Sequence, residues 1–205
     1  WNELLRLFTP LAMLLAIAFV LVRSGGLRHE RSFELKLVAA LALCLAGDVF
    51  LMFEGYFIPG LASFLAAHVC YLLLFRQDVR WFPDMRALAA TLLAAVAMYA
   101  FLFPNLGPVL KVAVAAYAFV IALMAGQAIG RAPALRNPAA GALLFMLSDT
   151  LLAINRFAQP LPMAPFWVLG TYYIAQALIV CNAAPSANAV TASSSLPRPA
   201  PSDAG

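Results

Sequence analysis

Three ionisable side chains lie deep inside apolar stretches of the sequence. Asp48 stands in LCLAGDVFLMFEGYF (43–57), Asp149 stands in GALLFMLSDTLLAINRF (141–157), and His68 lies in a third apolar stretch. A charge inside a bilayer costs about 2.5–3.5 kcal/mol even on the lenient insertion scale, so such residues tend to face a bundle interior or a cavity and to mark function. A pocket with carboxylates at its floor and a cation at its rim would suit a lipid whose phosphate stays near the membrane interface.

The composition indicates that these residues lie in a membrane protein. Hydrophobic residues make up 64% of the 205 and charged residues only 11%, against about 45–50% and about 25% in an ordinary soluble domain. Backbone polar groups inside a bilayer must be satisfied within the chain, which leaves helices or a closed barrel. The apolar runs are long and continuous, without the alternation of barrel strands. The sequence therefore predicts an all-α polytopic transmembrane bundle.

Seven segments have the length of a transmembrane helix, which needs roughly 20 apolar residues. Glycines and prolines fall between these segments or at their ends, as expected at helix boundaries. The end of the chain, 184–205, is small, polar and proline-rich, which is typical of a disordered tail. We therefore expect a transmembrane domain over 1–183, with helices over 4–22, 33–53, 57–75, 86–103, 109–129, 139–157 and 163–182.

Basic residues are concentrated in alternate connections between the predicted helices. The second, fourth and sixth connections hold only Lys111 and Arg156, whereas the others hold Arg23, Arg28, Arg31, Lys36, Arg76, Arg80, Arg86, Arg131 and Arg136. The positive-inside rule places the basic connections in the cytoplasm. The first predicted helix then begins outside, which an additional helix before residue 1 would explain simply. We expect a multi-pass protein of a bacterial inner membrane with a cytoplasmic C-terminal tail.

The predicted helices bring the three deep ionisable residues to a similar level. At about 1.5 Å per residue, Asp48 lies in the outer third of its helix, Asp149 slightly deeper, and His68 just past the midplane. All three can therefore approach one another in the outer half of the bundle. Arg156 follows Asp149 by seven residues, which in a continuous α-helix would place the arginine over the aspartate. Arg156 is thus a candidate phosphate anchor, and Lys111 is the other cation on that side.

Less specific interpretations account for the same residues. A single aspartate in a transmembrane helix can bond to a polar side chain of a neighbouring helix, and His68 can be a packing residue. One deep histidine and two aspartates fall short of the usual ligand set of a zinc site, so no metal is expected. The net charge of +4 lies mostly in the connections and does not indicate nucleic-acid binding. The cysteines have no CxxC spacing and are interpreted as small core residues: Cys44, Cys70 and Cys181.

Four motifs, in order along the chain, resemble one known family. They are AGDVFLM (46–52), GLASFLAAHVCYLLLF (60–75), GALLFMLSDTLLAINRF (141–157) and GTYYIAQALIV (170–180). Together they resemble the YhhN-type lysoplasmalogenase family, which also includes the vertebrate transmembrane lysoplasmalogenases. The resemblance covers roughly residues 9–182, and it implies an integral membrane fold that usually has eight helices.

The resemblance also implies which residues form the site. The family's Gly-Asp, His-x-x-Tyr, Ser-Asp and Tyr-Tyr-x-x-Gln motifs correspond to Gly47-Asp48, His68 with Tyr71, Ser148-Asp149, and Tyr172-Tyr173 with Gln176. The aspartates and the histidine are then the catalytic candidates, and the other side chains are candidates for substrate binding. Where many members carry Lys-Pro, this chain has Thr9-Pro10. A phosphate role of that lysine would pass to Arg156 or Lys111.

The family implies hydrolysis of the vinyl ether bond of lysoplasmalogens, giving a fatty aldehyde and a glycerophospho-ethanolamine or -choline. A vinyl ether is cleaved by protonation of its β-carbon to an oxocarbenium ion, attack by water and collapse of the hemiacetal. This needs one carboxyl in the acid form and one carboxylate, as in glycoside hydrolysis, and the two aspartates meet that need. The expected partners are a lysophospholipid substrate and membrane lipids, and no cofactor is expected.

Two other functions would use the same residues. A proton-coupled lipid transporter or scaffold would need buried aspartates, but it would also favour internal repeats and broken helices, for which the sequence gives no convincing sign. A metal-dependent membrane hydrolase would use Asp48, His68 and Asp149 as ligands. An α/β-type esterase is disfavoured because the sequence has no GxSxG motif.

Overall fold

Long α-helices make up the part of the chain that the structure describes. The computed structural model describes residues 2–23, 31–77, 79–131 and 136–182, with the side chains of residues 2–9, 23, 31 and 136 excepted. Within these ranges there is no β-strand, and seven long helices follow one another: α1 (Asn2–Arg23), α2 (Arg31–Leu51), α3 (Phe57–Phe75), α4 (Met85–Leu102), α5 (Pro108–Gly130), α6 (Arg136–Ala153) and α7 (Ala164–Asn182). The predicted all-α class is confirmed. The predicted tail and the side chain of Thr9 lie outside the described residues.

The helix ends follow local sequence signals. Asp84 precedes α4, and its Oδ1 accepts hydrogen bonds from the backbone N–H groups of Arg86 at 2.9 Å and Ala87 at 3.1 Å, as an N-cap does. Pro108 is the first residue of α5, where its missing N–H costs nothing. The end of α6 differs from the prediction, because the helix continues as a π-helical segment, η2 (Ile154–Ala158). A short 3₁₀ segment, η1 (Phe103–Asn105), similarly extends α4.

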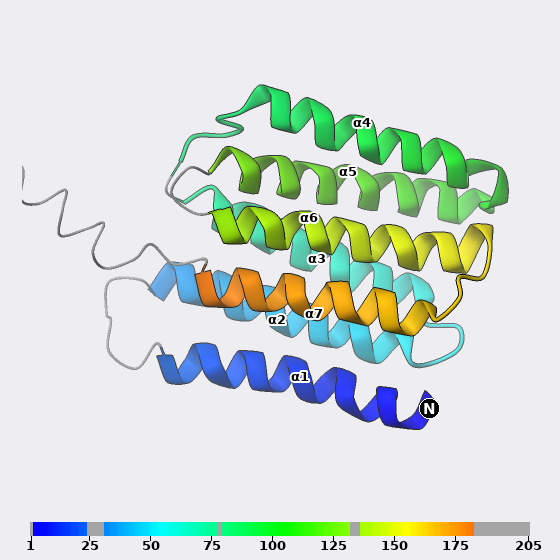
Figure 1. Ribbon diagram of the computed structural model, residues 1–205, viewed down its shortest axis with the longest axis horizontal. Helices are drawn as coiled ribbons and strands as arrows, with labels where there is room; N and C mark the ends of the chain where they lie inside the picture. The colour runs from blue at the N-terminus through cyan, green and yellow to red at the C-terminus, as the bar shows by residue number, and fades with distance from the viewer. Residues whose placement is uncertain (1, 24–30, 78, 132–135, 183–205) are drawn as a thin grey trace, which may run out of the picture.

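Six of the helices form a closed ring. Consecutive helices run in opposite directions (Figure 1), and the contacts around the ring join α1 to α2, α2 to α3, α3 to α5, α5 to α6, α6 to α7 and α7 to α1. Helix α4 lies outside this ring and packs along α5. The connections α2–α3, α4–α5 and α6–α7 lie at the same end of the bundle as the N-terminus, at the right of Figure 1. We refer to this end as the N-terminal end.

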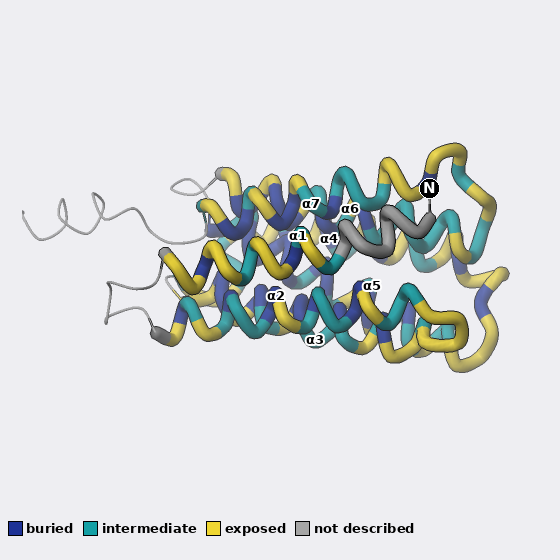
Figure 2. Tube along the Cα trace, turned by 90° about the horizontal axis from the view of Figure 1, so that it is seen from below, coloured by how far each residue is buried: buried dark blue, intermediate teal, exposed yellow. Residues whose placement is uncertain are grey.

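The surface of the bundle is apolar, as a lipid-facing surface must be. Figure 2 shows exposed positions along the outward faces of the helices, and large apolar side chains such as Leu93 and Val112 are 71% and 73% exposed there. Five helices in the described ranges are long and apolar enough to span a membrane, namely α3, α4 with η1, α5, α6 with η2, and α7. Helix α2 additionally carries Glu34, Lys36 and Asp48, and the apolar part of α1 that is described is Pro10–Val22. The chain is an integral, multi-pass membrane protein.

Glycines allow α2 and α3 to approach closely beside Asp48. A Cβ atom on Gly47 would lie 2.6 Å from the ring of Phe64, and one on Gly60 would lie 2.9 Å from the side chain of Leu51. Both distances are well below van der Waals contact, so a larger residue would force the two helices apart. The glycine that precedes Asp48 in the motif therefore has a packing role, because it seats Phe64 next to the aspartate.

We expect Gly47→Ala to destabilise the protein by about 1–3 kcal/mol, since the added methyl group overpacks the α2–α3 contact. The measurement is the Tm in detergent. Gly170→Ala is the matched control, because a Cβ on Gly170 would meet no atom within 4 Å and alanine is the better helix former. Equal Tm values for the two variants would contradict this account of Gly47.

Candidate active site

The two intramembrane aspartates line one cavity inside the helix ring. The cavity has a volume of about 330 Å³ and lies between α2, α3, α6 and the beginning of α7, in the half of the bundle nearer the N-terminal end. Asp48 and Asp149 both line it, together with Phe64, Ser148 and Tyr172. The matched depths predicted that Asp48, Asp149 and His68 would share one cavity; the two aspartates do share it, whereas His68 does not line it. We refer to this space as the carboxylate cavity.

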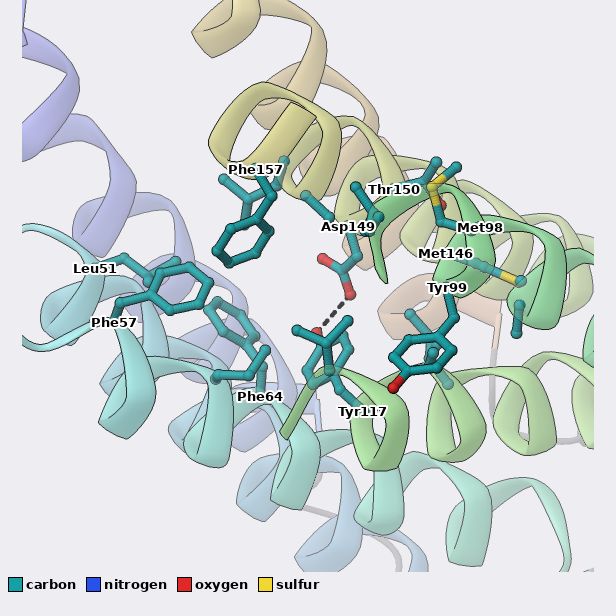
Figure 3. Close-up of a pocket in the computed structure, with 18 residues that line it drawn as sticks. Leu51, Phe57, Phe64, Met98, Tyr99, Tyr117, Met146, Asp149, Thr150 and Phe157 are labelled. Atoms are coloured by element: carbon teal, nitrogen blue, oxygen red, sulfur yellow. Dashed lines mark hydrogen bonds between the residues drawn. The ribbon is translucent and has the colours of Figure 1, made fainter. Parts of the chain in front are cut away.

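Each aspartate accepts a hydrogen bond from a tyrosine on another helix. The hydroxyl group of Tyr172 on α7 donates to Asp48 Oδ2 at 3.0 Å, and it also lies 3.5 Å from the sulfur of Met13 on α1. The hydroxyl group of Tyr117 on α5 donates to Asp149 Oδ2 at 2.6 Å, as the dashed line in Figure 3 shows. These bonds satisfy one oxygen of each carboxyl group and tie α7 to α2 and α5 to α6.

His68 lies close to Asp149 but does not line the carboxylate cavity. Its imidazole is buried, packed edge-on against the rings of Phe145 and Tyr117 at centroid distances of 4.6 and 5.3 Å. The Nε2 atom lies 3.7 Å from Asp149 Oδ2, which is longer than a hydrogen bond. The ring lies near the backbone carbonyl group of Phe64, yet neither nitrogen meets a partner with full hydrogen-bond geometry. His68 therefore lies behind Asp149, within reach of it after a small movement.

The remaining predicted residues on α3 and α7 form a second polar cluster, deeper in the ring. The hydroxyl group of Tyr71 donates to Gln176 Oε1 at 2.6 Å, and Gln176 Nε2 donates to the sulfur of Cys44 at 3.3 Å. All three side chains are buried, and none of them lines the carboxylate cavity. Tyr173 packs beside Tyr172 with ring centroids 5.3 Å apart and is likewise outside that cavity. This cluster joins α2, α3 and α7 beneath the aspartates.

Ser148 lies on the wall of the carboxylate cavity, but its hydroxyl group already has a partner. It donates to the backbone carbonyl oxygen of Val168 at 2.8 Å. The serine therefore ties α6 to α7 at the level of Asp149, and its oxygen keeps acceptor capacity toward the cavity.

Arg156 lines a wider opening at the N-terminal end that adjoins the carboxylate cavity. This opening, about 570 Å³, is lined by Glu54 and Arg156, and it shares Leu51, Met52, Leu152 and Asn155 with the carboxylate cavity. We call it the mouth. The prediction that Arg156 stands over Asp149 assumed a continuous α-helix, whereas Arg156 lies in the π-helical segment 154–158, where the residues per turn differ. The guanidinium group instead lies 5.4 Å above the ring of Phe57.

Lys111, the other predicted cation, lies apart from the carboxylate cavity and the mouth. Its Nζ atom is 4.0 Å from the centroid of the Phe103 ring, and its backbone carbonyl oxygen accepts a hydrogen bond from Tyr99 at 3.1 Å. The side chain lines neither space. Of the two candidate phosphate anchors, Arg156 is therefore the one that the fold connects to the aspartates.

An apolar cleft, distinct from the carboxylate cavity, is also lined by Asp149. It has a volume of about 80 Å³ and is lined mainly by α4, α5, α6 and the aromatic residues of α3. Figure 3 shows Tyr99 and Met98 on one side of this cleft, Phe57 and Phe64 on the other, and Asp149 between them. Asp149 thus separates an apolar cleft from the carboxylate cavity, and it lines both.

Tyr117 is the site residue that the sequence reasoning missed. It lies among alanine, phenylalanine and valine in an apolar helix, where an aromatic residue is usually a core residue. A comparison of depths could have identified Tyr117. Pro108 begins α5 and Ala158 ends η2, and both lie at the N-terminal end of the bundle. Tyr117 and Asp149 are each nine residues from that end, and therefore lie at a similar depth. Glu54 was also missed as a residue of the mouth, since it lies at a helix end, where charges are common.

The described residues contain no group of three or more His, Cys, Asp or Glu side chains that could hold a metal ion. His68 and Asp149 approach each other, whereas Asp48 is hydrogen-bonded to Tyr172. The two carboxyl groups are suited to proton transfer.

The fold and the site define a multi-pass membrane protein with two aspartates at a cavity that is reached from a polar mouth on one side and from an apolar cleft on the other. The YhhN family model matches residues 4–183, and the chain belongs to the YhhN family. The predicted resemblance is confirmed.

Named relatives of the chain are lysoplasmalogenases. The chain is 39% identical over 158 residues to lysoplasmalogenase TMEM86B of Sus scrofa, a match that covers 77% of this chain and 65% of the pig protein. It is 32% identical over 184 residues to lysoplasmalogenase TMEM86B of Homo sapiens, covering 89% and 76%. A lysoplasmalogenase of Mycobacterium bovis is 32% identical over 148 residues, covering 67% and 56%. No solved structure gives a significant match. The expectation of an enzyme agrees with these relatives.

Proposed function

We propose that this protein hydrolyses the vinyl ether bond of lysoplasmalogens with its two intramembrane aspartates. The observation that carries the proposal is that both aspartates line one cavity inside an apolar bundle, in a chain whose relatives are named lysoplasmalogenases. The reaction consumes one water molecule and yields a fatty aldehyde and a glycerophospholipid head group with a free hydroxyl. The chemistry needs one acid and one base, and no other reactant.

Asp149 is the better placed of the two for the acid. It lies between the apolar cleft and the carboxylate cavity, so that its carboxyl group can reach the β-carbon at the start of a hydrocarbon chain. In the acid form it transfers its proton to that carbon, and the adjacent carbon becomes the oxocarbenium centre. Because Tyr117 bonds to Oδ2, the other oxygen is left to carry the proton.

Asp48 is placed to act on water. It lines only the wider, more polar space, where its carboxylate can accept a proton from a water molecule as the water oxygen bonds to the oxocarbenium carbon. The hemiacetal then collapses: its hydroxyl proton leaves, the bond to the glycerol oxygen breaks, and that oxygen takes up a proton from the site. Asp149 regains its proton and Asp48 its charge, which closes the cycle.

The direct test is release of aldehyde from a lysoplasmalogen by the purified protein in detergent, with and without a chelator. We expect release in both cases, and none from the matched lysolipid whose chain is joined by a saturated ether. Loss of activity with the chelator, restored by a metal, would favour the metal-dependent hydrolase instead. Failure to release aldehyde from any lysoplasmalogen would favour a transporter or scaffold.

The mouth is the proposed position of the lipid head group. Glu54 and Arg156 line it, and among the described residues neither forms an ion pair with the other. Opposite charges that share a space without pairing are suited to a zwitterionic head group, with the phosphate at the arginine. The positive-inside rule places the mouth at the outer side of the inner membrane and the C-terminus in the cytoplasm, which labelling of a Glu54→Cys variant in intact cells tests.

We expect Arg156→Ala to raise KM by about three- to tenfold while kcat changes little, since an exposed charge anchors the lipid equally in the ground and transition states. The measurement is the kinetics of aldehyde release in mixed micelles. Lys111→Ala is the matched control and should leave KM unchanged, because Lys111 lines neither the mouth nor the carboxylate cavity. A rise in KM for Lys111→Ala alone would move the head group to α5.

A further inference from the structure

We infer that the apolar cleft at Asp149 is the binding site for the hydrocarbon chain of the substrate, and that the chain enters it sideways from the bilayer. This inference rests on the proposed function, whose site it extends. Its basis is that the cleft adjoins the carboxylate cavity at Asp149: Leu51, Phe64, Asp149 and Leu152 line both spaces. A chain in the cleft would therefore have its first carbons beside the Asp149 carboxyl group and its glycerol end in the wider cavity.

The lining of the cleft matches a hydrocarbon and little else. Toward the middle of the bundle it is formed by Ala95 on α4, Ile121 on α5 and Met146 on α6. The hydroxyl groups of its two tyrosines are already engaged, since Tyr117 donates to Asp149 and Tyr99 donates to the backbone of α5. A polar ligand would find few free partners there, whereas an alkenyl chain needs none.

The cleft is lined by apolar side chains at the N-terminal end and is bordered on the lipid side by α4. Leu102, Leu106 and Val114 form a buried apolar cluster at that end, against which Phe157 packs. This cluster opposes the descent of a chain into the cleft from the membrane surface. Helix α4 lies outside the ring, packs along α5, and meets the α6 side of the bundle at η2. A chain would then enter between α4 and α6.

The size of the cleft favours a single chain. Its volume of about 80 Å³ gives room for only the first few methylene groups of one chain, so the first carbons of a second chain have no place beside them. The hydrocarbon part of a one-chain lipid already lies at this depth in the bilayer, so that lateral entry does not require the chain to cross water. The cleft thus gives a physical reason for preferring lysolipids to two-chain lipids.

The test fills the cleft without touching the aspartates. Ala118 on α5 lines the cleft and is half-buried, whereas Ala116 on the same helix is exposed and does not line it. In Ala118→Phe we expect the ratio of kcat/KM for a hexadecenyl lysoplasmalogen to that for a butenyl one to fall by at least about tenfold. A long chain has to pass residue 118 to extend from Asp149 to the bilayer and would clash with the added ring, whereas a butenyl chain ends within the cleft. Ala116→Phe should keep the wild-type ratio. Ala95→Leu, a smaller change at the deeper end, should lower the ratio in the same direction.

An equal fall of kcat/KM for both chain lengths in Ala118→Phe, or the same ratio in both phenylalanine variants, would overturn the inference. A second measurement does not depend on turnover. A saturated-ether lysophospholipid with a diazirine at the end of its chain should photolabel α4, α5 and α6 around the cleft, and the unlabelled lipid should compete. Labelling spread over the lipid-facing surface without competition would overturn the inference even if aldehyde is released. Competed labelling of the cleft without aldehyde release would leave the cleft in place and refute the proposed hydrolysis.

Discussion

Asp149→Asn is expected to lower kcat by about 10²–10⁴-fold while the protein remains folded. The amide has the shape of the carboxyl group and can still accept the hydrogen bond from Tyr117, which is 2.6 Å long in the wild type. It cannot give a proton to carbon. Asp48→Asn should cause a loss of similar size, since the amide can bond to Tyr172 but cannot take a proton from water.

Aldehyde release gives the rates, and Tm in detergent verifies the fold. Asp84→Asn is the matched control, because Asp84 caps α4 outside the site and asparagine caps a helix equally well. Near-normal turnover by either cavity variant would remove that aspartate from the mechanism. A parallel loss of Tm and activity would assign the aspartate to packing between helices instead.

Tyr117→Phe is expected to lower kcat by about 10- to 100-fold and to leave KM nearly unchanged. The hydroxyl group orients the Asp149 carboxyl group through Oδ2, and it acts on the aspartate and not on the lipid. The split between kcat and KM separates this positioning role from a general loss of structure, which would also lower Tm.

Tyr99→Phe is the matched control for Tyr117→Phe. Tyr99 lines the same cleft, but its hydroxyl group donates to the backbone of Lys111 at 3.1 Å and is not bonded to an aspartate. We expect its kcat to stay within about threefold of the wild type. Comparable losses in the two variants would mean that tyrosine packing in the cleft, and not the bond to Asp149, controls the rate.

The helices could be predicted from the sequence because the thickness of the bilayer fixes the length of a transmembrane helix. Long apolar runs separated by proline and glycine leave little choice of boundary, and α3 was predicted at Phe57–Phe75, where the structure has it. The meeting of Asp48 and Asp149 could also be predicted, since depth along a helix follows from counting residues. Depth does not give the direction in which a side chain points around the helix axis. For this reason His68, Tyr71 and Gln176 share the level of the site or lie near it without lining the carboxylate cavity.

The features that were not predicted depend on local geometry or on apolar context. The π-helical turn at Ile154–Ala158 has no simple sequence signal, and Arg156 lies within it, at the mouth. Tyr117 resembles a core residue until its partner on α6 is known. The apolar cleft arises because α4 lies outside the ring formed by the other six helices. The lengths and order of the predicted helices do not determine which helices are neighbours in space, so this arrangement could not be predicted.

The position of Asp149 between a polar opening and an apolar one has a consequence for the products. Once the hemiacetal collapses, the two halves of the lipid have no bond between them and can leave in opposite directions. In the proposed reaction the glycerophospho half would leave through the mouth into water, and the aldehyde would leave between α4 and α6 into the bilayer. Neither product would then have to wait for the other, and the reactive aldehyde would stay out of the aqueous phase. An enzyme that oxidises or reduces the aldehyde would collect it from within the membrane.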